Sequence, residues 1–166
     1  MQQALPRFRP INRLDAKVTQ WLTRNSVSLV RMSLGFVFLA FGLLKFFPDV
    51  SPAEAIAIRT TDALTLGIVD GDLARLFVAA METAIGLSLL TGRYLRAGIA
   101  LLGIAMVGVL SPLVLFPGDL FSREYNAPTL EGQYVVKDIV LLTSGLIVGL
   151  RERGAEMMIA PDREES

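Results

Sequence analysis

The chain has 166 residues, of which 52% are hydrophobic, and its 16 basic side chains balance its 16 acidic ones. With a mean hydropathy of +0.52, a chain of this length has room for one membrane domain and excludes a second, soluble domain. The zero net charge gives no sign of a nucleic-acid partner. Because the sequence has no cysteine and no histidine, we expect no disulfide, no haem and no zinc site.

The first 26 residues are mostly polar and form the first predicted unit, a cytoplasmic segment with an interfacial amphipathic helix. One helical face of this segment collects the apolar side chains Ile11, Leu14, Val18, Trp21 and Leu22. A disordered basic tail is the alternative, because isolated helices this short are marginal without a surface. Asn25 and Ser26 are candidates for the N-cap of the helix that follows.

Four long apolar stretches follow, and each approaches the ~20 residues that a helix needs to cross a bilayer. They are Val27–Phe47, Leu73–Leu90, Ala97–Phe116 and Gln133–Leu150. Because unpaired backbone groups are too costly in lipid, the sequence predicts an all-α integral membrane protein with a four-transmembrane-helix bundle over residues 27–150. Pro112 removes the helix hydrogen bond to Gly108, so the third span should kink or end there. Residues 151–166 form a cytoplasmic tail.

The connection between the first two spans contains signals for a short extra helix over residues 52–66. Ser51 and Glu54 have the spacing of a capping box, Pro52 suits the first helical position, and Gly67 is a stop signal. Asp72 can cap the next span. We expect the extra helix to lie outside the membrane, over the mouth of the bundle, through Ile56, Ala63 and Leu66.

Basic residues indicate the orientation of the chain. They gather in the N-terminal segment, in the connection between the second and third spans, and in the tail: Arg7, Arg9, Arg13, Lys17, Arg24, Arg93, Arg96, Arg151, Arg153 and Arg163. The other two connections, residues 48–72 and 117–132, are acidic. The positive-inside rule therefore predicts a multi-pass protein with both termini in the cytoplasm.

Charged side chains inside the spans are the main functional clue, since an ionised group in lipid costs several kcal/mol unless it is paired or hydrated. Glu82 lies near the middle of the second span. Arg31 lies within one or two turns of the same depth on the first span, so we expect these two to pair. Arg31 and Lys45 share one helical face. Both lie near helix ends, where snorkelling to the interface is the structural alternative.

The start of the fourth span is unusually polar for a membrane helix. Gln133 and Lys137 share one face and Tyr134 and Asp138 another. Lys45, Glu131, Lys137 and Asp138 all lie toward the outer side and should form a second, more accessible cluster there. The candidates for proton transfer are Glu82, Lys137 and Asp138, and the candidates for ligand binding are Arg31, Lys45, Glu131, Gln133 and Tyr134. Buried ion pairs can also serve only to fix helix register.

Three short runs carry a family resemblance. They are Arg31 to Phe46, with Gly35 and Gly42, then Glu82 to Arg93, and Leu130 to Asp138. Their order and spacing resemble the DoxX/DoxD-like family of small four-helix membrane proteins, over roughly residues 27–150. The resemblance implies a four-helix bundle in the bacterial inner membrane. Some relatives are the membrane subunit of thiosulfate:quinone oxidoreductase, and others are associated with thiol stress, oxidant resistance or metallophore formation.

Because the chain lacks cysteine, a thiol relay does not fit it, whereas a quinone or another lipid-soluble ligand does. The favoured hypothesis is a redox-associated membrane component in which carboxylates exchange protons with a quinone-like ligand and lysines stabilise oxyanions. If it is an enzyme, it is a subunit of a quinone-linked oxidoreductase. A partner redox protein and a homo-oligomer are further expectations. The alternatives are a non-catalytic scaffold and a small-solute transporter.

Overall fold

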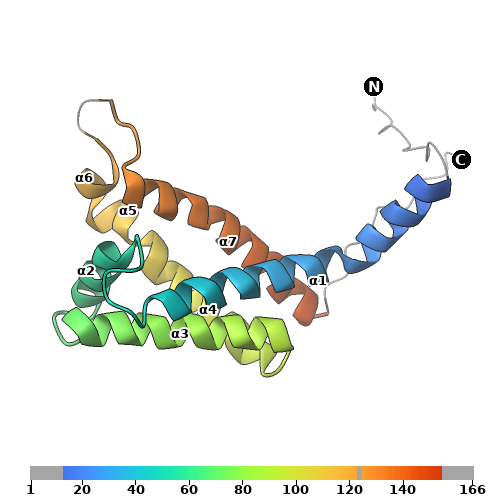
Figure 1. Cartoon of the computed structure of the whole chain (residues 1–166), viewed down its shortest axis with the longest axis horizontal. Helices are drawn as coiled ribbons and strands as arrows, with labels where there is room; N and C mark the ends of the chain where they lie inside the picture. Colours follow the sequence, from blue (N-terminus) through green and yellow to red (C-terminus); the bar gives the residue numbers. More distant parts are fainter. Residues whose placement is uncertain (1–12, 123–124, 155–166) are drawn as a thin grey trace, which may run out of the picture.

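The computed structural model describes residues 13–122 and 125–154, and these fold into an assembly of helices (Figure 1). In chain order the helices are α1 (Arg13–Leu44), α2 (Glu54–Leu64), α3 (Gly71–Thr91), α4 (Leu95–Leu110), α5 (Pro112–Leu115), α6 (Pro117–Leu120) and α7 (Leu130–Glu152). Within these described residues, four helical segments are long and apolar enough to cross a membrane: α1, α3, α4 together with α5, and α7. The protein is therefore an all-α integral membrane protein with a four-transmembrane-helix bundle and one extra helix, α2, between the first two spans.

Helix α1 begins well before the predicted first span and continues through it without a break. The expected cap at Asn25 and Ser26 is wrong. Asn25 Nδ2 donates to the Trp21 carbonyl oxygen at 2.8 Å, and Ser26 also bonds back to the preceding turn. The apolar face of the first turns is exposed, and its interfacial location remains a prediction. Expectations for residues 1–12 and 155–166 lie outside the part of the chain that the structure describes.

Helices α1 and α3 pack closely because glycines lie where they meet. A Cβ atom on Gly86 would come within 2.5 Å of the Leu39 backbone nitrogen, and one on Gly42 within 2.7 Å of the Thr83 backbone nitrogen. Around this contact lies the main apolar core, formed by Leu34, Phe38, Ile85, Leu89, Leu102, Ala105, Met106 and Val148. Burial of these side chains holds the four spans together at the end of the bundle away from α2.

The predicted break at Pro112 is confirmed, since α4 ends at Leu110 and α5 begins at Pro112. Proline has no N–H to donate to the Gly108 carbonyl. The Ser111 hydroxyl donates to that carbonyl instead, at 2.7 Å. The Gly108 carbonyl therefore keeps a hydrogen-bond partner where the regular helix is interrupted.

Helix α2 is present where the sequence predicts it, two residues shorter at each end. Gly67 ends it in a left-handed conformation, with φ at 81°. The predicted capping box is wrong: the N-cap residue is Ala53, and the Ser51 hydroxyl is buried without a hydrogen-bond partner in the described residues. The Glu54 carboxylate accepts from the Asp49 backbone N–H at 3.1 Å instead.

Helix α7 diverges from α3 toward the end of the bundle that carries α2, α5 and α6 (Figure 1). Thr129 is the N-cap of α7, and its hydroxyl accepts a hydrogen bond from the Gly132 backbone N–H at 3.1 Å. A second, smaller apolar cluster of Ile56, Leu120 and Val135 joins α2, α6 and α7. The short helices α2 and α6 thus cover the end of the bundle where α7 and α3 diverge.

Candidate functional site

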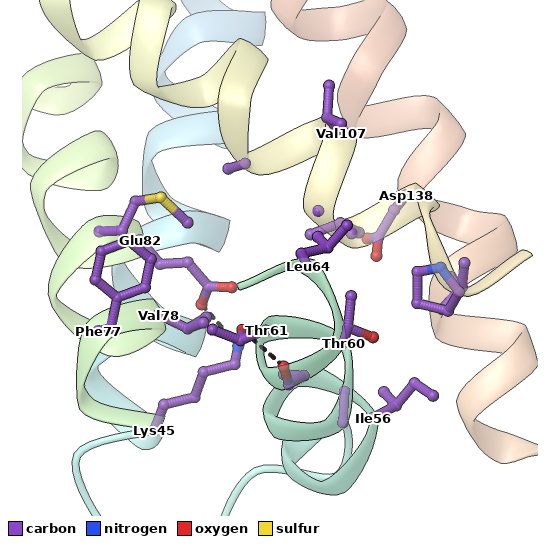
Figure 2. Close-up of a pocket in the computed structure, with 18 of the residues that line it drawn as sticks. Lys45, Ile56, Thr60, Thr61, Leu64, Phe77, Val78, Glu82, Val107 and Asp138 are labelled. Atoms are coloured by element: carbon purple, nitrogen blue, oxygen red, sulfur yellow. Dashed lines mark hydrogen bonds and ion pairs between the residues drawn. The ribbon is translucent and has the colours of Figure 1, made fainter. Parts of the chain in front are cut away.

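A cavity of about 460 Å³ lies beneath α2, between α3, α4 and α7 (Figure 2). Most of its wall is apolar, with side chains such as Phe77, Val78 and Val107 around it. In the described part of the chain, the charged residues that line it are Lys45, Glu82 and Asp138. They come from the end of α1, the middle of α3 and the third turn of α7.

Lys45 and Glu82 form a buried ion pair, with Nζ and Oε2 2.7 Å apart and side chains only 8% and 9% exposed (Figure 2). Lys45 directly follows the last residue of α1. Gly42, one turn earlier, lets α1 approach α3, and a Cβ there would lie 3.0 Å from the Glu82 Cβ. The close crossing of the two helices therefore brings the ammonium group to the carboxylate.

The predicted pair of Arg31 and Glu82 is wrong. Arg31 Nη1 donates to the Leu89 carbonyl oxygen at 2.8 Å, near the opposite end of α3 from α2. There its positive charge lies beside the negative end of the helix dipole. Arg31 is half-buried and does not line the cavity.

Arg75 is a functional candidate that the sequence analysis did not select. It is buried, and its Nη1 donates to the Lys45 carbonyl oxygen at 2.9 Å. Its Nη2 lies 2.8 Å from Asp72 Oδ1 and its Nε 3.7 Å from Glu54 Oε1. Asp72 is therefore an ion-pair partner and not the predicted cap of α3. The sequence feature that could have identified Arg75 is its position two turns before Glu82, on the same face of the helix.

The two faces of α7 lie differently with respect to the cavity, although residues of both were expected at the site. Tyr134 and Asp138 line the cavity, whereas Gln133 and Lys137 are exposed and lie outside it. Lys137 Nζ lies 6.0 Å from the centroid of the Tyr134 ring. Glu131 is half-buried and does not line the cavity. The structure thus brings two of these five residues to the site.

Asp138 completes a group of three charges. It lines the same cavity as Glu82 and Lys45, and no hydrogen bond or ion pair joins its side chain to a described residue. The expected separation of Glu82 from a more accessible outer cluster is wrong for Lys45 and Asp138, which share the cavity with Glu82. Two carboxyl groups here face a single ammonium group, so Asp138 is available to a bound molecule.

Helix α2 contributes cavity residues that the sequence analysis missed. Thr60 and Thr61 both line the cavity. The Thr61 hydroxyl bonds back to the α2 backbone at 2.9 Å, while that of Thr60 is buried without a partner among the described residues. Of the three residues expected over the bundle mouth, Ile56 is buried against it and Ala63 and Leu66 are exposed.

The family model described as DoxX matches residues 26–115, which is more than half of the chain. The match begins inside α1 and ends with α5, and it includes α2, Lys45, Arg75 and Glu82. Asp138 and the rest of α7 lie beyond it. No curated protein and no solved structure matches the chain.

Proposed function

Because the chain belongs to the DoxX family, we propose that it is a redox-associated membrane component that binds a quinone or another lipid-soluble carbonyl compound beneath α2. One observation carries this proposal. The cavity is apolar except for a few polar groups, and three charged residues of the described chain line it, two of them as a buried ion pair. Small-molecule sites commonly combine an apolar wall with a few well-placed polar groups.

The size and chemistry of the cavity suit such a ligand. Its volume of about 460 Å³ falls within the range of roughly 300–1,000 Å³ that small-molecule pockets occupy. The Lys45 ammonium has three N–H donors, and its one hydrogen bond to a described side chain goes to Glu82. Its remaining donors can therefore bind a ligand carbonyl oxygen.

The charged residues would handle protons, and electrons would come from elsewhere. Reduction of a quinone to a quinol takes two electrons and two protons. In the proposed reaction the Asp138 and Glu82 carboxylates each take up a proton from water and pass it to a ligand oxygen, and Lys45 stabilises the negative charge on those oxygens until the protons arrive. The electrons come from a partner redox protein, since this chain has no cysteine for a thiol relay.

Mass spectrometry of small molecules that the protein retains in mild detergent tests this function. The wild type should retain quinone, and Asp138→Asn and Glu82→Gln should retain about 10–100-fold less, which corresponds to the loss of a charge-assisted hydrogen bond. Glu131→Gln is the matched control, because Glu131 is an acid on α7 that does not line the cavity. Absence of quinone from the wild type, or equal retention by all variants, would overturn the proposal.

A scaffold role is the second candidate, and the tight crossing of α1 and α3 favours it. Gly42 permits this crossing and Lys45 and Glu82 join the two helices beside it, an arrangement that can fix helix register without any ligand. A scaffold would keep its function when Lys45 and Glu82 are replaced together by methionine. A quinone site would lose its ligand.

We also propose that the protein lies in a bacterial inner membrane with both termini in the cytoplasm. The connection between α3 and α4 carries Arg93 and Arg96, whereas the segments around α2 and α6 are acidic. The natural chain has no cysteine, so single cysteines can report the orientation. A membrane-impermeant thiol reagent should label Leu66→Cys in intact spheroplasts and should not label Tyr94→Cys. The reverse pattern would overturn this orientation.

A further inference from the structure

The cavity has a polar interior and an apolar mouth. Lys45 and Glu82 line it and are buried, each only 6% exposed. The most exposed residues of its wall are all apolar: Leu64 on α2, Phe77 on α3, and Ile104 and Val107 on α4. The cavity therefore opens between α3 and α4 through hydrocarbon side chains.

The position of this mouth along the helices places it inside the membrane. Phe77 lies six residues, or about 9 Å, after the start of α3 at Gly71. Val107 lies twelve residues, or about 18 Å, after the start of α4 at Leu95. Both depths fall within a hydrocarbon core of about 30 Å. The mouth thus faces lipid chains and not water.

The passage behind the mouth is open, whereas the α2 side is closed. A Cβ added at Gly108, the residue after Val107, would meet no atom within 4 Å. On the α2 side, Arg59 forms an ion pair with Asp119 of α6 and lies 4.0 Å from the centre of the Phe116 ring. These contacts close the α2 side and leave the side between α3 and α4 open to a molecule that moves between the bilayer and the cavity.

We propose that the substrate of this cavity is an amphiphile with a hydrocarbon tail, which enters sideways from the bilayer between α3 and α4. Its polar head reaches Lys45, Glu82 and Asp138, and its tail passes Val107 and Phe77 into the lipid. This inference rests on the proposed function and narrows its ligand class. A water-soluble solute would have to cross the hydrocarbon core to reach such a mouth.

Val107→Trp tests the lateral route, because it adds bulk at the mouth without changing any charged residue. Val107 is 69% exposed, so the larger side chain has room. Val140→Trp is the matched control: Val140 is 64% exposed on α7 and does not line the cavity. Each variant is loaded with a benzoquinone that carries a decyl tail, or with the same ring carrying a methyl group instead. The amount retained per chain is then measured.

The wild type and Val140→Trp should retain both compounds. Val107→Trp should retain about tenfold less of the tailed compound and a nearly unchanged amount of the short one, because the added ring overlaps the path of the tail. Equal retention of the tailed compound by all three proteins would overturn the lateral route and leave the proposed function standing. An equal loss of both compounds would also overturn it, since the substitution would then act on the head-group site. No binding to the wild type would overturn both.

Discussion

The two ends of the bundle use the same four spans in opposite ways. At the end away from α2, α1, α3, α4 and α7 enclose a continuous apolar core. At the α2 end, the divergence of α7 leaves a cavity with a buried ion pair (Figure 1). Glycines take both roles in this bundle: Gly35, Gly86 and Gly145 lie against neighbouring helices, whereas Gly108 beside the cavity faces open space. A glycine in a membrane helix therefore permits either close packing or an opening, and only its neighbours decide which.

The largest expected effect comes from breaking the ion pair at the hollow end. Lys45→Met leaves the Glu82 carboxylate buried without its cation, and we expect a loss of about 3–5 kcal/mol in the free energy of unfolding. The double variant Lys45→Met, Glu82→Met should recover most of that loss, because two apolar side chains fit an apolar surrounding. Denaturant unfolding in mild detergent measures both.

The double variant also separates the two candidate functions. If it is stable and keeps the cellular function, the ion pair serves only helix register. If it is stable and loses the retained quinone, the pair belongs to the binding site. A single Lys45→Met variant as stable as the wild type would contradict the burial that the structure assigns to Glu82.

A smaller effect should come from overfilling the packed end. Gly86→Ala places a methyl group against the Leu39 backbone, so the two helices must separate, at a cost of about 1–3 kcal/mol in unfolding free energy. Gly108→Ala is the matched change on α4. It meets no neighbour and should raise stability by up to about 1 kcal/mol, because alanine favours a helix. Thermal unfolding of the two variants side by side measures the difference in their stability. Equal stability would show that the two glycines do not differ in their packing.

The smallest effect concerns the attachment of α2. Arg59→Gln removes the exposed ion pair to Asp119 and the contact with the Phe116 ring, which together contribute about 1 kcal/mol or less. Global stability should barely change. Hydrogen exchange should become faster in α2 and stay the same in α3, because only α2 loses a contact. Unchanged exchange in α2 would mean that its attachment depends on Ile56 and its apolar neighbours.

The elements of this fold were largely predictable because their signals are local. Long apolar runs fix the spans, Gly67 ends α2, and Pro112 divides the third span. The boundary at Asn25 could not be predicted. Its side chain can either cap a helix or bond back to the preceding turn, and it does the second. The neighbouring residues in the sequence do not indicate which of these two hydrogen bonds Asn25 forms.

The site was only partly predictable because it depends on the register between helices. Tyr134 and Asp138 follow from one helical face, but the partner of Glu82 depends on where α1 and α3 cross. Leu39 meets Gly86 and Gly42 meets Thr83, so Lys45 is the residue that reaches Glu82. The depth of the residues in the membrane, taken alone, favoured Arg31 as the partner of Glu82. Matching the glycines of the two helices first would have given the correct pair.

The short turn between α3 and α4 has a consequence for how the cavity is assembled. Gly92 and Tyr94 both have positive φ, and the Ser88 hydroxyl donates to the Arg93 carbonyl at 2.9 Å, so these two helices fold back on each other within a few residues. Contacts so close along the chain form early, and contacts between distant segments form late. Asp138 on α7 is 93 residues after Lys45. We therefore expect the hairpin of α3 and α4 to form before Asp138 joins Lys45 and Glu82, so that the third charge reaches the cavity only when the last helix docks.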